Sequence, residues 1–386
     1  MITNVRSSTG LSGFYIIFEG STMTEKDGHK GISHFLEHMV CKSFEHLQNI
    51  YQQKNIKWNA YTSPTEIVFF LKGLDRHINF HKKEFLDLIL SYEPTQEQLD
   101  NEKKIVLEEY KKSFNSQIEA HYMNLQRKRF NYYNAIGLRS DIEKFTLQDC
   151  KDYLKKFYKK PTKIINISKF NDFEHPVKFR KKPTVKPFQI KDYDNLHIIT
   201  SDEETDVPEG MIPLEIINNF KNKVSIINTS PIITKNFAYA SFLCEMLGSG
   251  LNSPLYKEVR EKLGLVYSIH CYNDKLNDKS SMIGISTDTS NKNIEIVQNQ
   301  IKMVLENKEK YLTQERFDIV KDSYLTKIEE SEILNYSSIR KYIDDPEWLI
   351  ETIINDVTLK DVYDLVDQYL DWNVLYKSVD KTEFEV

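Results

Sequence analysis

With 386 residues, 40% of them hydrophobic and 28% charged, the chain has the composition of a folded globular protein rather than a disordered or fibrous one. Its formal net charge of −5 at pH 7 gives no general sign of a nucleic-acid or anionic-membrane partner. No stretch approaches the roughly 20 apolar residues that cross a bilayer. We therefore expect a protein that binds neither nucleic acid nor membrane.

Chain length and cysteine spacing bear on domain number and compartment. A chain of this length exceeds a usual single core, so two domains are expected. The four cysteines are scattered, with no Cys-x-x-Cys pair and no spacing typical of a disulfide framework. The apolar run from Phe14 to Phe18 is shorter than the roughly 7–15 residues of a signal peptide's apolar region. These features predict a reducing, cytoplasmic location.

The predicted elements of the first block extend to about residue 170. The run from Tyr15 to Phe18 indicates a buried strand, with no strand expected before it, and a helix follows from about residue 29 or 31. Residues 58–71 are rich in aromatic and β-branched residues and predict a strand or hairpin, interrupted at Ser63-Pro64. The block is completed by helices over 80–90, 96–130 and 146–157 and a strand over 162–167.

Residues 171–196 differ in character, because prolines and basic residues replace the periodic apolar pattern. A solvated linker is favoured over a basic binding patch, since no aromatic residues are interleaved as stacking platforms. Residues 197–386 repeat the strands and amphipathic helices of the first block, which suggests an ancient duplication. We predict domains over 1–170 and 197–386, joined by a linker over 171–196.

Residues 34–38 read His-Phe-Leu-Glu-His within the predicted helix. Residues four apart on a helix lie within about 40° of each other, so the His34 and His38 imidazoles can reach one metal ion. Glu37 lies between them and can address a metal-bound water instead of the metal. The alternative is a pair of histidines that are simply hydrogen-bonded at the surface or in the core.

A zinc site needs a third protein ligand, and the segment from residue 100 to 110 offers candidates. Glu102 and Glu109 are seven residues apart, or two helical turns, and share a face. Glu108 is rotated by about 100° from that face, which predicts a solvated side chain. Because acidic residues on helices are usually solvated, this pair alone does not define a site.

The segment Gly31-Ile-Ser-His-Phe-Leu-Glu-His-Met39 resembles the inverted zinc motif of the inverzincins. These are the metallopeptidases related to pitrilysin, insulin-degrading enzyme and the mitochondrial processing peptidase. The family places a third ligand, a Glu, about 70 residues after the second His and keeps another Glu seven residues earlier, as here. The resemblance implies Zn²⁺ held by His34, His38 and Glu109, Glu102 behind these ligands, and Glu37 as general base toward a metal-activated water.

Trp58-Asn-Ala-Tyr-Thr-Ser63 resembles the edge strand to which the family's peptide substrates add as an extra strand through main-chain hydrogen bonds. The resemblance implies substrate contacts from Asn59, Ala60 and Tyr61. It also implies an α+β fold of two similar domains, each a mostly antiparallel sheet with helices packed on one face. Together the two domains would form half of a clamshell, as in short bacterial-type members of the family.

Residues 253–268 resemble the family's Arg/Tyr segment, which implies that Arg260 and Tyr267 contact the substrate near the scissile bond. Without the resemblance, a surface Arg and a core Tyr would be the simpler interpretation. In long relatives the zinc lies in the first half and the Arg/Tyr pair in the last domain. A homodimer of this chain would therefore build two composite sites, each with zinc from one subunit and Arg260 and Tyr267 from the other.

The resemblance thus implies a zinc-dependent endopeptidase that hydrolyses unfolded peptides or oligopeptides inside a closed chamber. One alternative is a peptidase that removes a leader from a dedicated precursor, working with a partner subunit. A second alternative is a non-catalytic scaffold subunit of the same fold. Such subunits typically lose zinc ligands, whereas all of the expected ones are present here.

Overall fold

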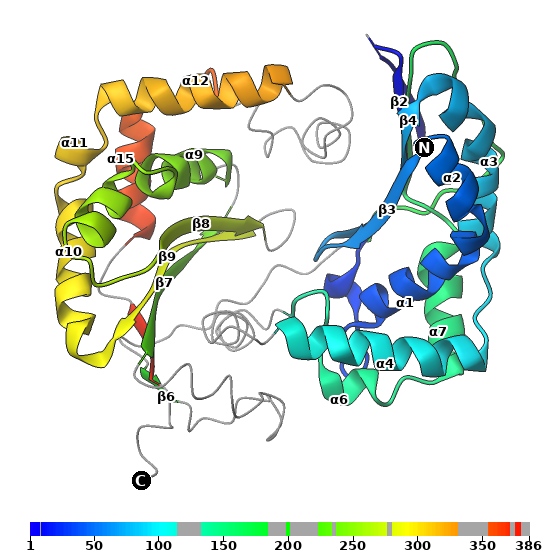
Figure 1. Ribbon diagram of the computed structural model, residues 1–386, viewed down its shortest axis with the longest axis horizontal. Helices are drawn as coiled ribbons and strands as arrows, with labels where there is room; N and C mark the ends of the chain where they lie inside the picture. Colours follow the sequence, from blue (N-terminus) through cyan, green and yellow to red (C-terminus); the bar gives the residue numbers. More distant parts are fainter. Residues whose placement is uncertain are drawn as a thin grey trace. The chain divides into compact units, whose positions relative to one another are not determined.

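The computed structural model describes residues 1–7, 9–113, 133–183, 198–200, 223–233, 237–275, 280–330, 354–370 and 375–379. They divide into two compact units, the first formed mainly by residues 1–110 and 133–183 and the second by described residues beyond 187 (Figure 1). Within the described residues, no helix combines the length and apolarity needed to cross a bilayer.

The first unit contains a five-stranded sheet in the order β1-β5-β2-β4-β3. Its strands are β1 (Ile2–Arg6), β2 (Leu11–Glu19), β3 (Lys57–Thr62), β4 (Glu66–Leu74) and β5 (Lys163–Ser168). β1 and β5 are parallel, and every other pair is antiparallel. The apolar run Phe14–Phe18 lies in β2 near the middle of the sheet and is at most 1% exposed.

The expectation that no strand precedes Tyr15 is wrong, because β1 forms there. β1 is only five residues long, is nowhere fully buried, and pairs with β5 from Ile2 opposite Ile164 onward. A short strand at a sheet edge carries little pattern of its own, and its partner lies far away along the chain. Local periodicity therefore could not reveal it.

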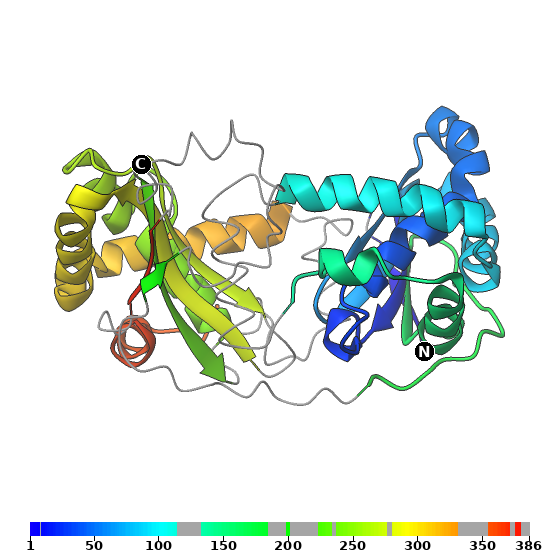
Figure 2. The same cartoon turned by 90° about the horizontal axis from the view of Figure 1, so that it is seen from below.

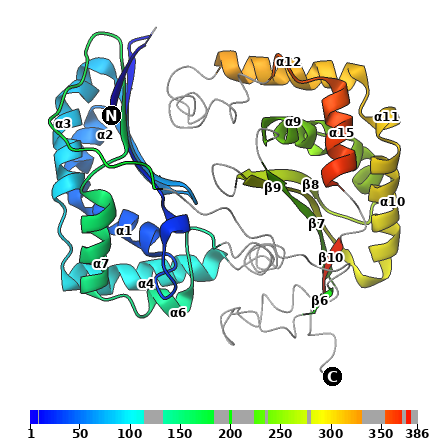
Figure 3. The ribbon, with the colours of Figure 1, turned by 180° about the vertical axis from the view of Figure 1, so that it is seen from behind.

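Helices cover one face of this sheet (Figures 1 and 3). They are the short η1 (Thr22–Thr24), α1 (Ile32–Cys41), η2 (Lys42–Leu47), α2 (Gln48–Gln53), α3 (Asp75–Ser91), α4 (Gln96–Ser113), α6 (Arg139–Ile142), α7 (Leu147–Tyr153) and the π-helical turn η3 (Leu154–Tyr158). Aromatic rings fill the space between the two layers, as where Phe18 stacks on Tyr158 at 5.2 Å and meets Phe69 edge-to-face at 6.1 Å. Residues 114–130 of the predicted long helix lie outside the described residues.

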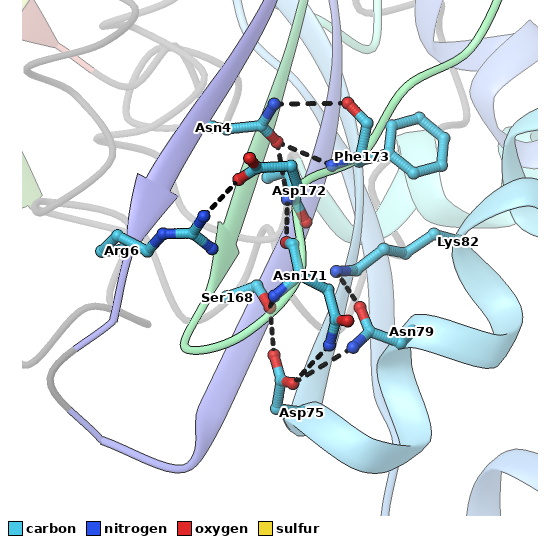
Figure 4. A network of polar contacts seen from close by, with 10 residues as sticks. Asn4, Arg6, Asp75, Asn79, Lys82, Ser168, Asn171, Asp172 and Phe173 are labelled. Atoms are coloured by element: carbon cyan, nitrogen blue, oxygen red, sulfur yellow. Dashed lines mark hydrogen bonds and ion pairs between the residues drawn. The ribbon is translucent and has the colours of Figure 1, made fainter.

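A polar network closes the end of the sheet where α3 begins (Figure 4). The buried Asp75 carboxylate accepts hydrogen bonds from Ser168, from Asn79 at 3.1 Å and from Asn171 at 3.2 Å. The buried Lys82 donates to Asn79, and burial lowers the pKa of its ammonium group to about 8, although the charge of Asp75 opposes this. The network ties α3 to β5 and to the segment after it.

The described part of the predicted linker, residues 171–183, packs on the first unit. Phe173 is 9% exposed and meets Phe14 edge-to-face with ring centroids 4.6 Å apart. The Arg180 guanidinium lies 5.2 Å from the Phe157 ring and donates to the Glu19 carbonyl, and Lys182 lies 3.1 Å from the Glu19 carboxylate. Arg180 and Lys182 thus attach the segment to the first unit. Residues 184–196 lie outside the described residues.

The second unit contains a sheet in the order β6-β10-β7-β9-β8. Its strands are β6 (Ile198–Thr200), β7 (Lys223–Ile233), β8 (Ile269–Lys275), β9 (Ser280–Ser290) and β10 (Leu375–Val379). β6 and β10 are parallel, and the other pairs are antiparallel. Strand for strand this is the connectivity of the first sheet, so two similar, mostly antiparallel domains are confirmed.

In its described residues the second unit has the helices α9 (Phe237–Gly248), the π-helical turn η4 (Tyr256–Glu261), the short η5 (Asn291–Asn293), α10 (Ile294–Glu306), α11 (Lys308–Tyr311), α12 (Gln314–Glu330) and α15 (Leu359–Tyr369). α9 and α15 lie side by side and pack on the sheet (Figure 3). Their apolar faces join one core that includes Leu243, Met246, Val362 and Leu365.

Candidate metal centre

The helix that carries the His-Phe-Leu-Glu-His segment begins in a constrained way. Gly31 precedes α1 with φ of 96°, and a Cβ there would lie 2.5 Å from the Ile136 carbonyl oxygen, so only glycine fits. Gly31 is the N-cap residue and has no side chain that could cap the helix. Glu25 takes this role, because its carboxyl oxygens accept hydrogen bonds from the backbone N–H of Gly31 at 2.9 Å and of Ser33 at 2.8 Å. Burial raises the pKa of Glu25 to about 7.

α1 and α4 lie side by side (Figures 1 and 2). The side chains of three predicted ligands, His34, His38 and Glu109, lie close to one another. The rings of His34 and His38 have centroids 4.5 Å apart. One Glu109 oxygen lies 3.7 Å from His34 Nε2, and the other lies 3.4 Å from His38 Nε2. One ligand atom from each residue lies within 4.8 Å of the others, and this is the one such group found among the described residues.

The donor set fits a zinc ion. Ligand atoms about 2.0–2.1 Å from one tetrahedral zinc lie about 3.3 Å from each other, close to the observed spacing. Two imidazole nitrogens and one carboxylate form the His₂Glu set of catalytic zinc sites, which leaves a fourth position for water or substrate.

Glu102 lies behind the centre, where the family resemblance had implied it. Its carboxylate is 3% exposed, and its Oε1 lies 2.9 Å from His38 Nδ1. A carboxylate on the outer nitrogen fixes the ring orientation and leaves Nε2 free to bind a metal. Glu108 is exposed on the neighbouring face, as expected.

The two imidazoles have different electrostatic surroundings in the metal-free chain. Burial, with a contribution from His38, lowers the pKa of His34 to about 3, so this ring is neutral and ready to coordinate. Burial also opposes charge on His38, but the Glu102 hydrogen bond and the nearby carboxylates outweigh it and raise the pKa of that ring.

Glu37 lies on α1 between the two histidines in sequence and is 7% exposed. Burial raises the pKa of its carboxyl, the Glu109 charge adds to this, and the Thr62 hydrogen bond and His38 oppose it. Thr62 Oγ1 donates to Glu37 Oε2 at 2.7 Å. A raised pKa suits a group that must accept and return a proton.

Sequence reasoning did not single out Thr62 or Glu25. Thr62 belongs to the segment that resembles the family's edge strand. Since alternate residues of a strand share a face, its spacing of two from Ala60 could have indicated that it faces the helices. Glu25 precedes α1 by seven residues, and no local pattern connects it to the helix that it caps.

The three residues expected to contact substrate lie on β3, which is an edge strand of the described sheet and pairs with β4. Asn59 is exposed, Tyr61 is half-buried and Ala60 is 8% exposed. Trp58 anchors the strand on the helical layer through Phe44, with ring centroids 4.7 Å apart. Within the part of the chain that the structure describes, the other edge of β3 pairs with no strand.

Arg260 and Tyr267 belong to the second unit and lie near each other. The Arg260 guanidinium carbon lies 4.5 Å from the Tyr256 ring and 5.9 Å from the Tyr267 ring. Gly264, with φ of 64°, caps the turn by donating to the Arg260 carbonyl at 3.0 Å. Tyr267 is 87% exposed, so it is not the core residue of the simpler interpretation.

Two family models match the chain. The model "Insulinase (Peptidase family M16)" matches residues 5–136, which include all the metal-centre residues. The model "Peptidase M16 inactive domain" matches residues 162–324, which include Arg260 and Tyr267. The chain belongs to this family of peptidases.

Individual relatives extend the match over most of the chain. An uncharacterized zinc protease of Rickettsia bellii is 22% identical over 352 residues, covering 86% of this chain and 83% of the relative. The mitochondrial-processing peptidase subunit beta of Arabidopsis thaliana is 23% identical over 165 residues, covering 40% and 31%. The crystal structure of a protease from Helicobacter pylori has the same fold, with a TM-score of 0.78, 19% identity and coverage of 98% and 96%.

Proposed function

We propose that this protein is a zinc-dependent endopeptidase. The observation that carries the proposal is the convergence of His34, His38 and Glu109, whose ligand atoms lie within 4.8 Å of one another, beside the buried Glu37. Relatives named as zinc proteases support the same assignment.

Each residue of the centre has a distinct role in the proposed reaction. When bound, zinc would act as a Lewis acid toward water and the scissile carbonyl and would lower the pKa of that water toward about 7. Glu37 takes a proton from the attacking water and returns it to the departing amine. Glu102 holds the His38 ring in the orientation that directs Nε2 toward Glu109.

The substrate is proposed to be an unfolded peptide or oligopeptide. Among the described residues the outer edge of β3 pairs with no strand, and this supports the proposal, because an extended peptide can add to such an edge through main-chain hydrogen bonds. Arg260 and Tyr267 are proposed to contact the peptide near the scissile bond. Their donors would stabilise charge that develops on the carbonyl oxygen.

The direct test combines metal analysis with hydrolysis of a quenched peptide, with and without a chelator. We expect about one zinc per chain and activity that the chelator abolishes and zinc restores. Glu37→Gln should retain zinc and lose activity by a factor on the order of 10²–10⁴, because the general base is gone. A metal-free protein that cleaves no peptide, or a Glu37→Gln variant as active as the wild type, would contradict the proposal.

We further propose that two copies of the chain form a homodimer with composite sites. The relative named as a processing peptidase subunit beta supports assembly with a second chain. An equal mixture of Glu37→Gln and Tyr267→Phe, dissociated and reassembled, should regain about a quarter of the wild-type sites. Activity that stays at the level of the separate variants would show that each site is built within one chain.

A further inference from the structure

The side chain that orients the proposed general base comes from the substrate strand. Thr62 ends β3 and lies on the same face as Trp58 and Ala60, the face on which α1 packs. Within the described part of the chain, its hydroxyl is the one side-chain hydrogen-bond donor to Glu37, at 2.7 Å. One Glu37 oxygen is thereby engaged, and the other is left for a proton.

Thr62 itself is held by a well-fixed turn. Ser63 N–H donates to the Glu66 carbonyl at 2.8 Å, which closes the β3–β4 hairpin. The hairpin tip is attached to the segment after β2, because Gly20 N–H donates to the Thr65 carbonyl and Met23 N–H donates to the Pro64 carbonyl. The hydroxyl therefore occupies a position set by backbone contacts on both sides.

We propose that Thr62 is a positioning residue that aligns Glu37 for proton transfer. A general base must lie within about 2.6–3.2 Å of the proton that it removes, so a freely rotating carboxylate would spend much of its time misaligned. This inference rests on the proposed function.

The test uses three variants of the full chain. Thr62→Val keeps the β-branched shape and removes the hydroxyl, Thr62→Ser keeps the hydroxyl, and Thr65→Val removes a hydroxyl from the same hairpin away from Glu37. We expect Thr62→Val to lower kcat by about 10- to 100-fold, with KM within about two-fold and zinc content unchanged. Thr62→Ser should recover most of kcat, and Thr65→Val should match the wild type.

A second readout does not depend on activity. In crystal structures of Thr62→Val, the Glu37 carboxylate should leave its present rotamer, whereas it should keep that rotamer in Thr62→Ser and Thr65→Val. An unchanged rotamer, an unchanged kcat, or an effect on KM alone in Thr62→Val would overturn the inference. Failure of the proposed function would appear separately, as a wild-type protein that neither binds zinc nor cleaves peptide.

A different observation in the second unit supports an independent inference. The sulfur atoms of Cys244 on α9 and Cys271 on β8 lie 3.2 Å apart. A Cβ at Gly248 would lie 2.8 Å from the Cys271 nitrogen, so glycine permits the close approach of helix and strand that brings the thiols together. Cys244 is 8% exposed, and Cys271 is half-buried.

We infer that Cys244 and Cys271 form a modification site for disulfide reagents. Their oxidation to a disulfide would cross-link the two ends of the segment that carries Arg260 and Tyr267. Cys271, as the thiolate, attacks oxidised glutathione, forms a mixed disulfide and releases one glutathione. Cys244 then loses its proton to solvent, attacks the Cys271 sulfur and releases the second glutathione. Two protein thiols become one disulfide while one glutathione disulfide is reduced to two glutathione molecules.

Treatment of the reduced, full-length protein with oxidised glutathione tests this site. We expect the four titratable thiols to fall to two, peptide mapping to join Cys244 to Cys271, and the melting temperature to rise by roughly 5–10 °C. Cys150→Ser should still form the bond, and Cys244→Ser should instead keep one glutathione on Cys271. A lasting glutathione adduct on the wild type, a disulfide mapped elsewhere, or no reaction would overturn the inference.

Discussion

Both units contain the same kind of helix–strand contact, but different side chains meet in it. In each, the helix after the second strand packs on the free-edge strand, α1 on β3 in the first unit and α9 on β8 in the second. In the first unit this contact joins Glu37 to Thr62, and in the second it joins Cys244 to Cys271. The shared topology therefore fixes where helix and strand meet, and the side chains placed there decide the chemistry.

α1 and α9 are each held at one end by an ionisable side chain, α1 at its N-terminus and α9 at its C-terminus. The carboxylate of Glu25 binds the N-terminal N–H groups of α1, and the guanidinium of Arg316 binds carbonyl groups at the C-terminal end of α9. When ionised, each group has the sign of charge that the helix dipole favours at that end. α1 thus has its fixed end next to His34, and α9 has its fixed end next to the loop that leads to Arg260.

The largest effect should come from removing a metal ligand, which would test whether zinc belongs to the first unit alone. Glu109→Gln replaces a charged ligand by a neutral one, and we expect zinc affinity to fall by more than about 100-fold. Glu108→Gln, on the adjacent exposed position, should bind zinc like the wild type. Titration with a chelating indicator measures both, and equal losses in the two variants would exclude Glu109 as the specific ligand.

An intermediate effect should appear in the pH dependence of folding. The raised pKa of Glu25, about 7, means that the folded metal-free chain keeps a proton that the unfolded chain loses near pH 4.5. The contribution of Glu25 to the free energy of unfolding should therefore fall as pH rises from 4.5 to 7, by on the order of 3 kcal/mol. The difference in free energy of unfolding between the wild type and Glu25→Gln should shift by this amount across the range, whereas the difference between the wild type and the exposed control Glu97→Gln should stay nearly constant. Denaturant unfolding across this range provides the measurement, and parallel curves for the wild type and Glu25→Gln would refute the assignment.

The smallest effect should follow from loosening the end of α9. The Arg316 guanidinium donates to the carbonyls of Glu245 at 3.1 Å, Ser249 at 3.2 Å and Asn252 at 3.2 Å, and also to that of Met246. Lysine cannot reproduce this fork, so Arg316→Lys should cost about 1–2 kcal/mol, or roughly 3–6 °C in melting temperature. Zinc binding should not change. If Arg316→Lys lost zinc, zinc binding by the first unit would depend on the stability of the second.

Most of the fold could be predicted from the sequence because its elements carry their own patterns. The apolar run of β2 and the aromatic and β-branched β3–β4 hairpin, interrupted at Ser63-Pro64, appear where they were expected. β1 did not, because its pairing with β5 is a distant contact that no local pattern encodes.

The metal centre was predictable to the extent that helical spacing defines it. The four-residue spacing of His34 and His38 and the seven-residue spacing of Glu102 and Glu109 each define a face of one helix. That these faces meet needed the family resemblance, because helix–helix contacts are tertiary. Thr62 and Glu25 could not be predicted, since each reaches its partner through the path of a loop or strand rather than through sequence periodicity.

The strand order has a consequence for how the chain folds. β5 lies between β1 and β2, and β10 lies between β6 and β7, so the last strand made in each unit occupies an interior position. Ile2 pairs with Ile164, and Ile198 pairs with Lys377, which makes these contacts among the most distant in the chain. Since such contacts slow folding, neither sheet can close until its final strand has left the ribosome. A nascent chain stopped before residue 163 should keep the β2–β4–β3 pairing and leave β1 without a neighbour.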